Sequence, residues 1–296
     1  MNNNILNFFG QDAADISANR VESHDWQAAG VDCIYIIFIT GRCGSTWLTH
    51  LLEDSGICGH PHELFNETLM PRFNKSIEAA NFKEYFTGAV TQFSSGGRFG
   101  FKIDEWRLSH LLPLIDFRTL FPAEITRCFW MTRRDLVSQA FSFGRAKTTG
   151  HWHDFTAKTT EQKQDHVELS DARMWKEIID ILAKERRMAA LFQREGIDYV
   201  PLDYEQMLAD RLLTVMRVMI ELGCRYEEIN SFIQRMEDKT LRLEFGNKYE
   251  VLGRFCARYG RLLLTLDKER QEISTDELKR RLQLDYGLSL WERGTG

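Results

Sequence analysis

Short apolar runs alternate along the chain with longer segments in which apolar residues recur every three or four positions. The short runs read CIYIIFIT at 33–40, RFGFKI at 98–103, ITRCFWM at 125–131 and DYVPL at 198–202. Runs of this length, rich in β-branched and aromatic residues, are typical of strands, and the almost continuously apolar 33–40 fits one buried on both faces of a parallel sheet. We therefore predict four strands at these positions.

The segments with helical spacing predict helices over 46–53, 75–90, 135–147, 165–195 and 204–222. Strands that alternate with helices imply right-handed crossovers and a mostly parallel sheet with helices on both faces. The predicted fold class is therefore α/β. We expect an N-terminal extension at 1–30, the α/β core at 31–225 and a helical, charge-rich C-terminal extension at 226–296, packed on the same domain.

The turn after the first predicted strand reads TGRCGSTW over 40–47. Gly41 and Gly44 let the main chain approach an anion closely, and a helix that starts at Ser45 or Thr46 directs backbone N–H groups toward the same point. The turn makes the predicted sheet P-loop-like. It differs from the loop of nucleotide triphosphatases, because no lysine precedes Ser45. The plain alternative is that Gly-Ser-Thr only caps a helix.

The composition and charge of the chain argue against some functions and indicate a cellular location. The chain has 296 residues and a formal net charge of −5, which argues against binding to nucleic acid. The first residues do not resemble a signal peptide, and the longest apolar run is far shorter than the roughly 20 residues that span a bilayer. The six cysteines are scattered without metal-ligand spacing. We expect a cytoplasmic protein with free thiols, no integral membrane segment and no metal.

The turn and three further sequence blocks resemble motifs of a known family. Residues 41–46 resemble the R-S-G-S-T loop of sulfotransferases that use 3′-phosphoadenosine 5′-phosphosulfate (PAPS). Residues 132–146, TRRDLVSQAFSFGRA, resemble the R-x-D-x-V-x-Q-A-x-S-x-x-R-A block of the bacterial trehalose, nodulation and lipopolysaccharide sulfotransferases. Residues 59–65 (GHPHELF) resemble the same family's G-x-P-x-E-x-F element, and 202–205 resemble its late strand-to-helix motif.

The resemblance implies roles for residues that bind PAPS, without a metal. The 5′-phosphosulfate would be held by residues of the turn, and Arg42 would stabilise the charge that develops on the bridging oxygen. Arg133 would bind the 3′-phosphate together with Ser138 or Ser142, two serines on one helix face. Cys43 takes the place of the usual serine, which removes one side-chain hydrogen bond and keeps the backbone cradle. The turn residues concerned are Gly41, Arg42, Cys43, Gly44, Ser45 and Thr46.

Glu63 is the predicted general base, which takes the proton of the acceptor hydroxyl. His60 and His62 are rivals for this role, since imidazole is the commoner base near neutral pH. The candidates for contact with the acceptor are His62, Lys102, Trp152 and His153. Lys102 is equally compatible with an ordinary edge-strand lysine, and Trp152 with a core residue.

The expected activity is transfer of a sulfuryl group from PAPS to a hydroxyl of a carbohydrate or glycolipid. Two other functions stay open: a P-loop-type nucleotide kinase or hydrolase, and a non-catalytic phosphonucleotide-binding protein. Magnesium-dependent turnover of ATP would favour the first, and cofactor binding without transfer would favour the second. The sequence does not decide between a monomer and a homodimer.

Overall fold

The computed structural model describes residues 3–150, 167–236 and 247–290. The chain divides into two compact units. We call residues 1–132 with 190–238 the sheet unit and residues 133–189 with 239–296 the helical unit. The division into an extension, a core and a C-terminal extension stays a prediction. Within the described ranges, no helix is both long enough and apolar enough to cross a membrane.

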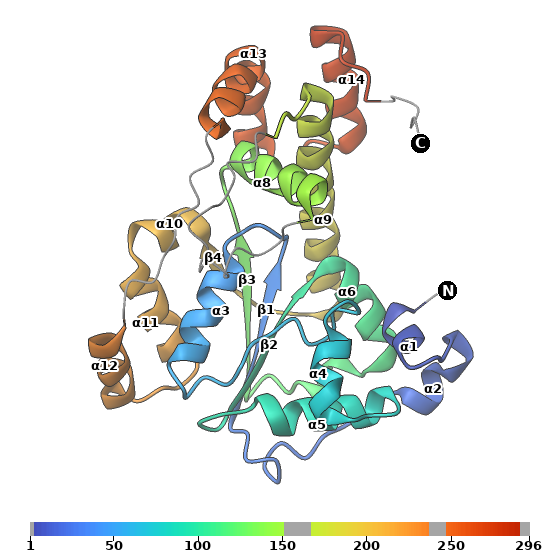
Figure 1. Ribbon diagram of the computed structural model, residues 1–296, viewed down its shortest axis with the longest axis vertical. Helices are drawn as coiled ribbons and strands as arrows, with labels where there is room; N and C mark the ends of the chain where they lie inside the picture. The colour runs from blue at the N-terminus through green and yellow to red at the C-terminus, as the bar shows by residue number, and fades with distance from the viewer. Residues whose placement is uncertain (1–2, 151–166, 237–246, 291–296) are drawn as a thin grey trace. The chain divides into compact units, whose positions relative to one another are not determined.

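The sheet unit is built on a parallel sheet. Its strands are β1 (Cys33–Ile39), β2 (Arg98–Asp104), β3 (Thr126–Thr132) and β4 (Val200–Asp203), and in the described residues they follow the order β2-β1-β3-β4. All neighbouring strands pair in parallel. Figure 1 shows the strands side by side, with helices packed on the sheet. The predicted α/β fold class is confirmed, and each predicted strand is present.

Helices cover both faces of this sheet. On one face, Tyr35 and Ile37 pack with Leu48 of α3 and Val215 of α11. On the other face, Phe38 meets Phe192 of α9 with ring centroids 4.8 Å apart. Alternate residues of β1 thus enter two different apolar layers, as expected of a strand buried on both sides. The helices in this unit are α1 (Asn4–Phe8), α2 (Ile16–Asn19), α3 (Ser45–Asp54), α4 (Met70–Ile77), α5 (Phe82–Phe93), α6 (Glu105–Leu111), α7 (Phe117–Leu120), α10 (Tyr204–Ala209), α11 (Arg211–Glu221) and α12 (Tyr226–Arg235).

Two of the predicted helices are each two helices, because polar caps interrupt the apolar pattern. The predicted helix at 75–90 is interrupted: α4 ends at Ile77, Glu78 takes the left-handed conformation, and Asn81 caps α5 by accepting from the Glu84 N–H. The predicted helix at 204–222 breaks at Asp210, which accepts from the Leu213 N–H at the start of α11. Asparagine and aspartate at these positions satisfy the free N–H groups of a new helix.

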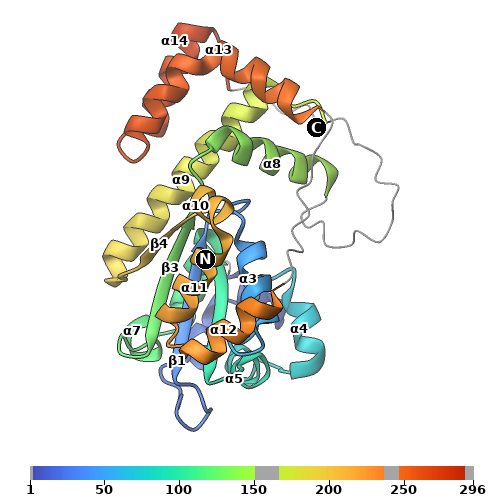
Figure 2. The ribbon, with the colours of Figure 1, turned by 90° about the vertical axis from the view of Figure 1, so that its left-hand side faces the viewer.

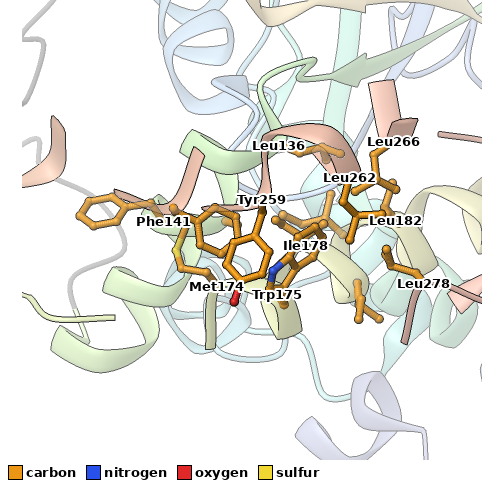
Figure 3. Close-up of a cluster of buried hydrophobic side chains, with 14 of the residues drawn as sticks. Leu136, Phe141, Met174, Trp175, Ile178, Leu182, Tyr259, Leu262, Leu266 and Leu278 are labelled. Carbon is orange, nitrogen blue, oxygen red and sulfur yellow. The ribbon is translucent and has the colours of Figure 1, made fainter. Parts of the chain in front are cut away.

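The helical unit consists of α8 (Leu136–Thr149), α13 (Lys248–Glu269), α14 (Thr275–Tyr286) and most of α9 (Asp171–Glu195), whose last residues belong to the sheet unit. Figure 2 shows α8 beside α9, and α13 followed by α14. Their apolar faces form one core. Trp175 is fully buried there, and Figure 3 shows it beside Tyr259. The rings of Phe255 and Tyr259 each lie 5.4 Å from the Trp175 ring, measured between centroids.

Replacing Trp175 with alanine is expected to destabilise the helical unit by about 3–5 kcal/mol, because the substitution leaves a large cavity in a close-packed core. Urea denaturation of the full chain measures this cost. The matched control is Trp106→Ala, since Trp106 is 50% exposed and its loss should change stability by less than about 1 kcal/mol. Equal effects of the two substitutions would contradict the packing described for α8, α9, α13 and α14.

Candidate functional site

The turn between β1 and α3 has a backbone that favours an anion. Gly41, Arg42 and Gly44 all have positive φ, at 69°, 55° and 85°. Gly44 is the N-cap of α3 and contributes no side-chain cap to its first turn. Figure 1 shows α3 starting beside the carboxyl end of β1, the end at which ligands of parallel sheets collect. The predicted strand–turn–helix arrangement is therefore present.

Cys43 faces the interior of the sheet unit. Its side chain is fully buried in the apolar cluster that contains Leu48 and Met207. Burial raises the pKa of the thiol, and hydrogen bonds from Thr40 and Ser45 oppose that rise only in part. Any contribution of Cys43 to ligand binding would therefore come from its backbone.

Lys102 connects this turn to the predicted base. It lies on β2, at the edge of the sheet, yet the residue is only 5% exposed. Its Nζ donates to Thr46 Oγ1 at 3.0 Å and lies 3.3 Å from Glu63 Oε1. Among the described strands, Lys102 is therefore on an edge strand, with its ammonium group against Thr46 and Glu63, and its contact with the acceptor stays a prediction.

The carboxylate of Glu63 is held from its other side as well. Asn66 Nδ2 donates to Glu63 Oε2 at 2.7 Å, and Arg107 of α6 donates to Asn66 Oδ1 at 3.0 Å. Burial raises the pKa of Glu63, but Lys102, the Asn66 hydrogen bond and Arg107 together outweigh burial and lower the pKa below its ordinary value. The group is therefore ionised at neutral pH and able to accept a proton.

The two histidines that compete with Glu63 as base face a different carboxylate. His60 Nδ1 lies 2.9 Å from Glu53 Oε1, and His62 Nε2 lies 3.6 Å from the same oxygen. Burial is the main cause that lowers the pKa of His62; His60, Lys102 and Arg72 lower it further, and Glu53 opposes them. The loop at 59–63 thus presents two separate groups of polar side chains.

The residues predicted to bind the 3′-phosphate lie in the helical unit. Arg133 directly follows β3, and Asp135, the first residue of the predicted helix at 135–147, caps α8 by accepting from the Ser138 N–H at 2.9 Å. Arg270 of the C-terminal region fixes the main chain here, because it donates to the carbonyl oxygens of Arg133, at 2.7 Å, and Arg134, at 3.2 Å. Trp152 and His153 lie outside the described residues.

Several residues of this site were missed in the sequence. Asn66 and Arg107 orient Glu63 from 3 and 44 positions away along the chain, and Arg270 reaches the start of α8 from a region in which no chemistry was expected. Glu53 was read only as part of an amphipathic helix. The one local signal is the Asn three residues after Glu63, because the spacing of a single turn brings two such side chains together.

Gly44→Ala is expected to disrupt the turn. A Cβ at this position would lie 2.4 Å from the Tyr204 ring and 2.9 Å from Met207 Cε, and a non-glycine residue at φ +85° costs about 1–2 kcal/mol in addition. The control is Gly56→Ala, which has φ +74° and no atom within 4 Å of the added Cβ. Urea denaturation should show the larger loss for Gly44→Ala, and similar losses would argue against the close approach of Tyr204.

Two of three comparisons with known proteins found a match to this chain. Residues 113–249 match the family model described as Stf0 sulphotransferase, a range that includes β3, Arg133, Ser138 and Ser142. Among solved structures, the sulfotransferase domain of the Synechococcus PCC 7002 olefin synthase is 13% identical, with 76% of this chain and 95% of that chain covered and a TM-score of 0.39. No curated protein matches the chain.

Proposed function

We propose that this chain is a sulfotransferase, as its match to the Stf0 sulphotransferase family model over residues 113–249 supports, and that it transfers a sulfuryl group from PAPS to a hydroxyl of a carbohydrate or glycolipid. The observation that carries the proposal is the position of Lys102 between Thr46 and Glu63. One ammonium group touches both the turn that suits a phosphosulfate and the carboxylate that suits a base. Sulfuryl transfer requires the donor and the acceptor to be held next to each other, and this arrangement would do so.

In the proposed reaction, the acceptor oxygen attacks sulfur as its proton passes to Glu63. A bond forms between the acceptor oxygen and sulfur, and the bond between sulfur and the bridging phosphate oxygen breaks. Adenosine 3′,5′-bisphosphate leaves with the electron pair of that bond. The charge that grows on the bridging oxygen is stabilised by Arg42 and Lys102, and that on the phosphate by the N–H groups at the start of α3.

The 3′-phosphate is assigned to Arg133 with Ser138 or Ser142. The arginine follows the carboxyl end of β3, where ligands of parallel sheets bind, and its guanidinium suits a phosphate because it can donate two parallel hydrogen bonds. The contacts from Arg270 and the cap from Asp135 support the proposal, since they fix the backbone from which these side chains extend.

We propose that the acceptor approaches Glu63 from the side on which the loop at 59–63 lies. His62, Trp152 and His153 remain the proposed contacts for a sugar, for which an aromatic face suits the C–H groups of the ring. Glu63 is protonated when it takes the proton of the acceptor. It would then release this proton to water, which completes the turnover.

The test is an assay with PAPS labelled on sulfur and a panel of glycans and glycolipids, with ATP and Mg²⁺ in parallel. We expect labelled sugar esters and calorimetric binding of adenosine 3′,5′-bisphosphate. Binding without transfer would favour the non-catalytic phosphonucleotide-binding protein, and magnesium-dependent ATP hydrolysis would favour the kinase or hydrolase. Failure of both binding and transfer would overturn the proposal.

A further inference from the structure

A second cluster of polar side chains lies in the sheet unit, where the end of α3 meets the loop that follows it. The ligand atoms of Glu53, His60 and His62 all lie within 4.8 Å of one another. Two of these spacings are 2.9 Å, from Glu53 Oε1 to His60 Nδ1, and 3.6 Å, from the same oxygen to His62 Nε2. Around a tetrahedral zinc ion with bonds of about 2.0–2.1 Å, neighbouring ligand atoms are about 3.3 Å apart. These two spacings bracket that value, and the shorter of them is a hydrogen bond that a bound ion would replace.

The two imidazole rings are held in place by the surrounding structure. His62 stacks on Phe73 with ring centroids 5.4 Å apart, and Phe93 contacts both histidine rings edge-on, at 5.5 and 6.5 Å. The backbone is fixed as well, because His60 donates its N–H to the Phe93 carbonyl and His62 accepts from the Lys102 N–H. Ligands that are already oriented lose little conformational entropy when they bind an ion.

The charge at the end of α3 also favours a cation. Glu53 and Asp54 are the last two residues of this helix, and its last turn contains no basic residue. Carboxylates at this end face the negative pole of the helix dipole, which is unfavourable unless a positive charge lies nearby. The side chains of Glu53, His60 and His62 are 29%, 40% and 32% exposed, so an ion can reach them from solvent.

We propose that Glu53, His60 and His62 form a binding site for one divalent transition-metal ion, with zinc as the best fit. Two imidazole nitrogens and one carboxylate oxygen are ligands that zinc accepts, and three protein ligands leave a fourth position for water. The bound ion ties the loop at 59–63 to α3 and so restrains the segment that carries Glu63. This inference does not rest on the proposed sulfuryl transfer.

Titration of the untagged, metal-stripped full chain with Zn²⁺ alone by calorimetry tests the site, followed by Co²⁺ in an absorption spectrometer. We expect one ion per chain, a tetrahedral cobalt spectrum without a thiolate charge-transfer band, and a higher melting temperature with Zn²⁺. Glu53→Gln and His62→Gln should each weaken binding roughly 100-fold, since even partners of the ligands contribute 10–100-fold. His110→Gln is the control, because His110 hydrogen-bonds to the Trp106 carbonyl on α6.

Two results would overturn the proposal. One is a Zn²⁺ affinity that is the same in the wild type, Glu53→Gln and His110→Gln. The other is a cobalt spectrum with thiolate bands, which would assign binding to cysteines such as the pair Cys58 and Cys224, whose sulfur atoms are 3.8 Å apart. Far-ultraviolet circular dichroism checks that each variant is folded. If Glu53→Gln does not fold, His60→Gln takes its place, since its ring is partly exposed and its loss leaves no cavity.

Discussion

Glu63→Gln is expected to lower kcat for sulfuryl transfer by a factor of about 10²–10⁴, the usual contribution of a general base. The amide keeps the size of the side chain but cannot accept the proton of the acceptor hydroxyl. The Glu63 carboxylate contacts Asn66 and Lys102 and is not itself proposed to touch the nucleotide, so binding of adenosine 3′,5′-bisphosphate should stay nearly unchanged. Steady-state kinetics with PAPS and calorimetry with the bisphosphate measure the two quantities.

Two further variants make this result specific. Glu84→Gln removes a carboxylate from the exposed start of α5 and should retain full turnover. Glu63→Asp keeps the charge but withdraws the carboxylate by one methylene, so we expect an intermediate loss in kcat that reflects distance to the acceptor. If Glu63→Gln bound the bisphosphate normally and turned over at the wild-type rate, the base would have to be another group.

The sheet could be predicted from sequence because its signals are local. Each strand is a run of apolar residues, and burial on two faces requires such a run whatever surrounds it. The boundaries of β1 and β3 were predicted to within one residue for this reason. The helices were harder, since Asn81 and Asp210 lie within apolar patterns that continue past them. A cap residue decides such a case only when its side chain turns back to the new helix, which a pattern does not reveal.

The site was predictable only where its residues follow one another in the chain. The turn at 41–46 has this property, and so does the cap at Asp135. The network around Glu63 does not have this property. Lys102 lies on the next strand and Arg107 on the next helix after it, and only the folded chain brings them to the loop. Glu53 had no sequence signal at all, since its relation to the two histidines depends on how the chain turns after α3.

Lys102→Met is expected to lower kcat/KM by a factor of about 10²–10³, comparable to the loss of one fixed donor that stabilises developing charge. Methionine retains the length of the side chain and its apolar part, which suits the 5% exposure of this residue. The product nucleotide carries no sulfuryl group, so its binding should weaken much less than transfer does. The control is Lys75→Met on α4, an exposed lysine whose replacement should leave both quantities unchanged.

The double variant Lys102→Met/Glu63→Gln decides whether the two side chains act as one unit. The ammonium and the carboxylate are 3.3 Å apart, and residues in contact seldom have additive effects. If Lys102 works partly by keeping Glu63 ionised and aimed at the acceptor, removing it costs little once the carboxylate is gone. Because Lys102 is also proposed to stabilise the bridging oxygen of the donor, we expect the double variant to be slower than Glu63→Gln alone, but by less than the full loss measured for Lys102→Met. Full additivity of the two losses would mean that Lys102 acts on the donor through Thr46 and independently of the base.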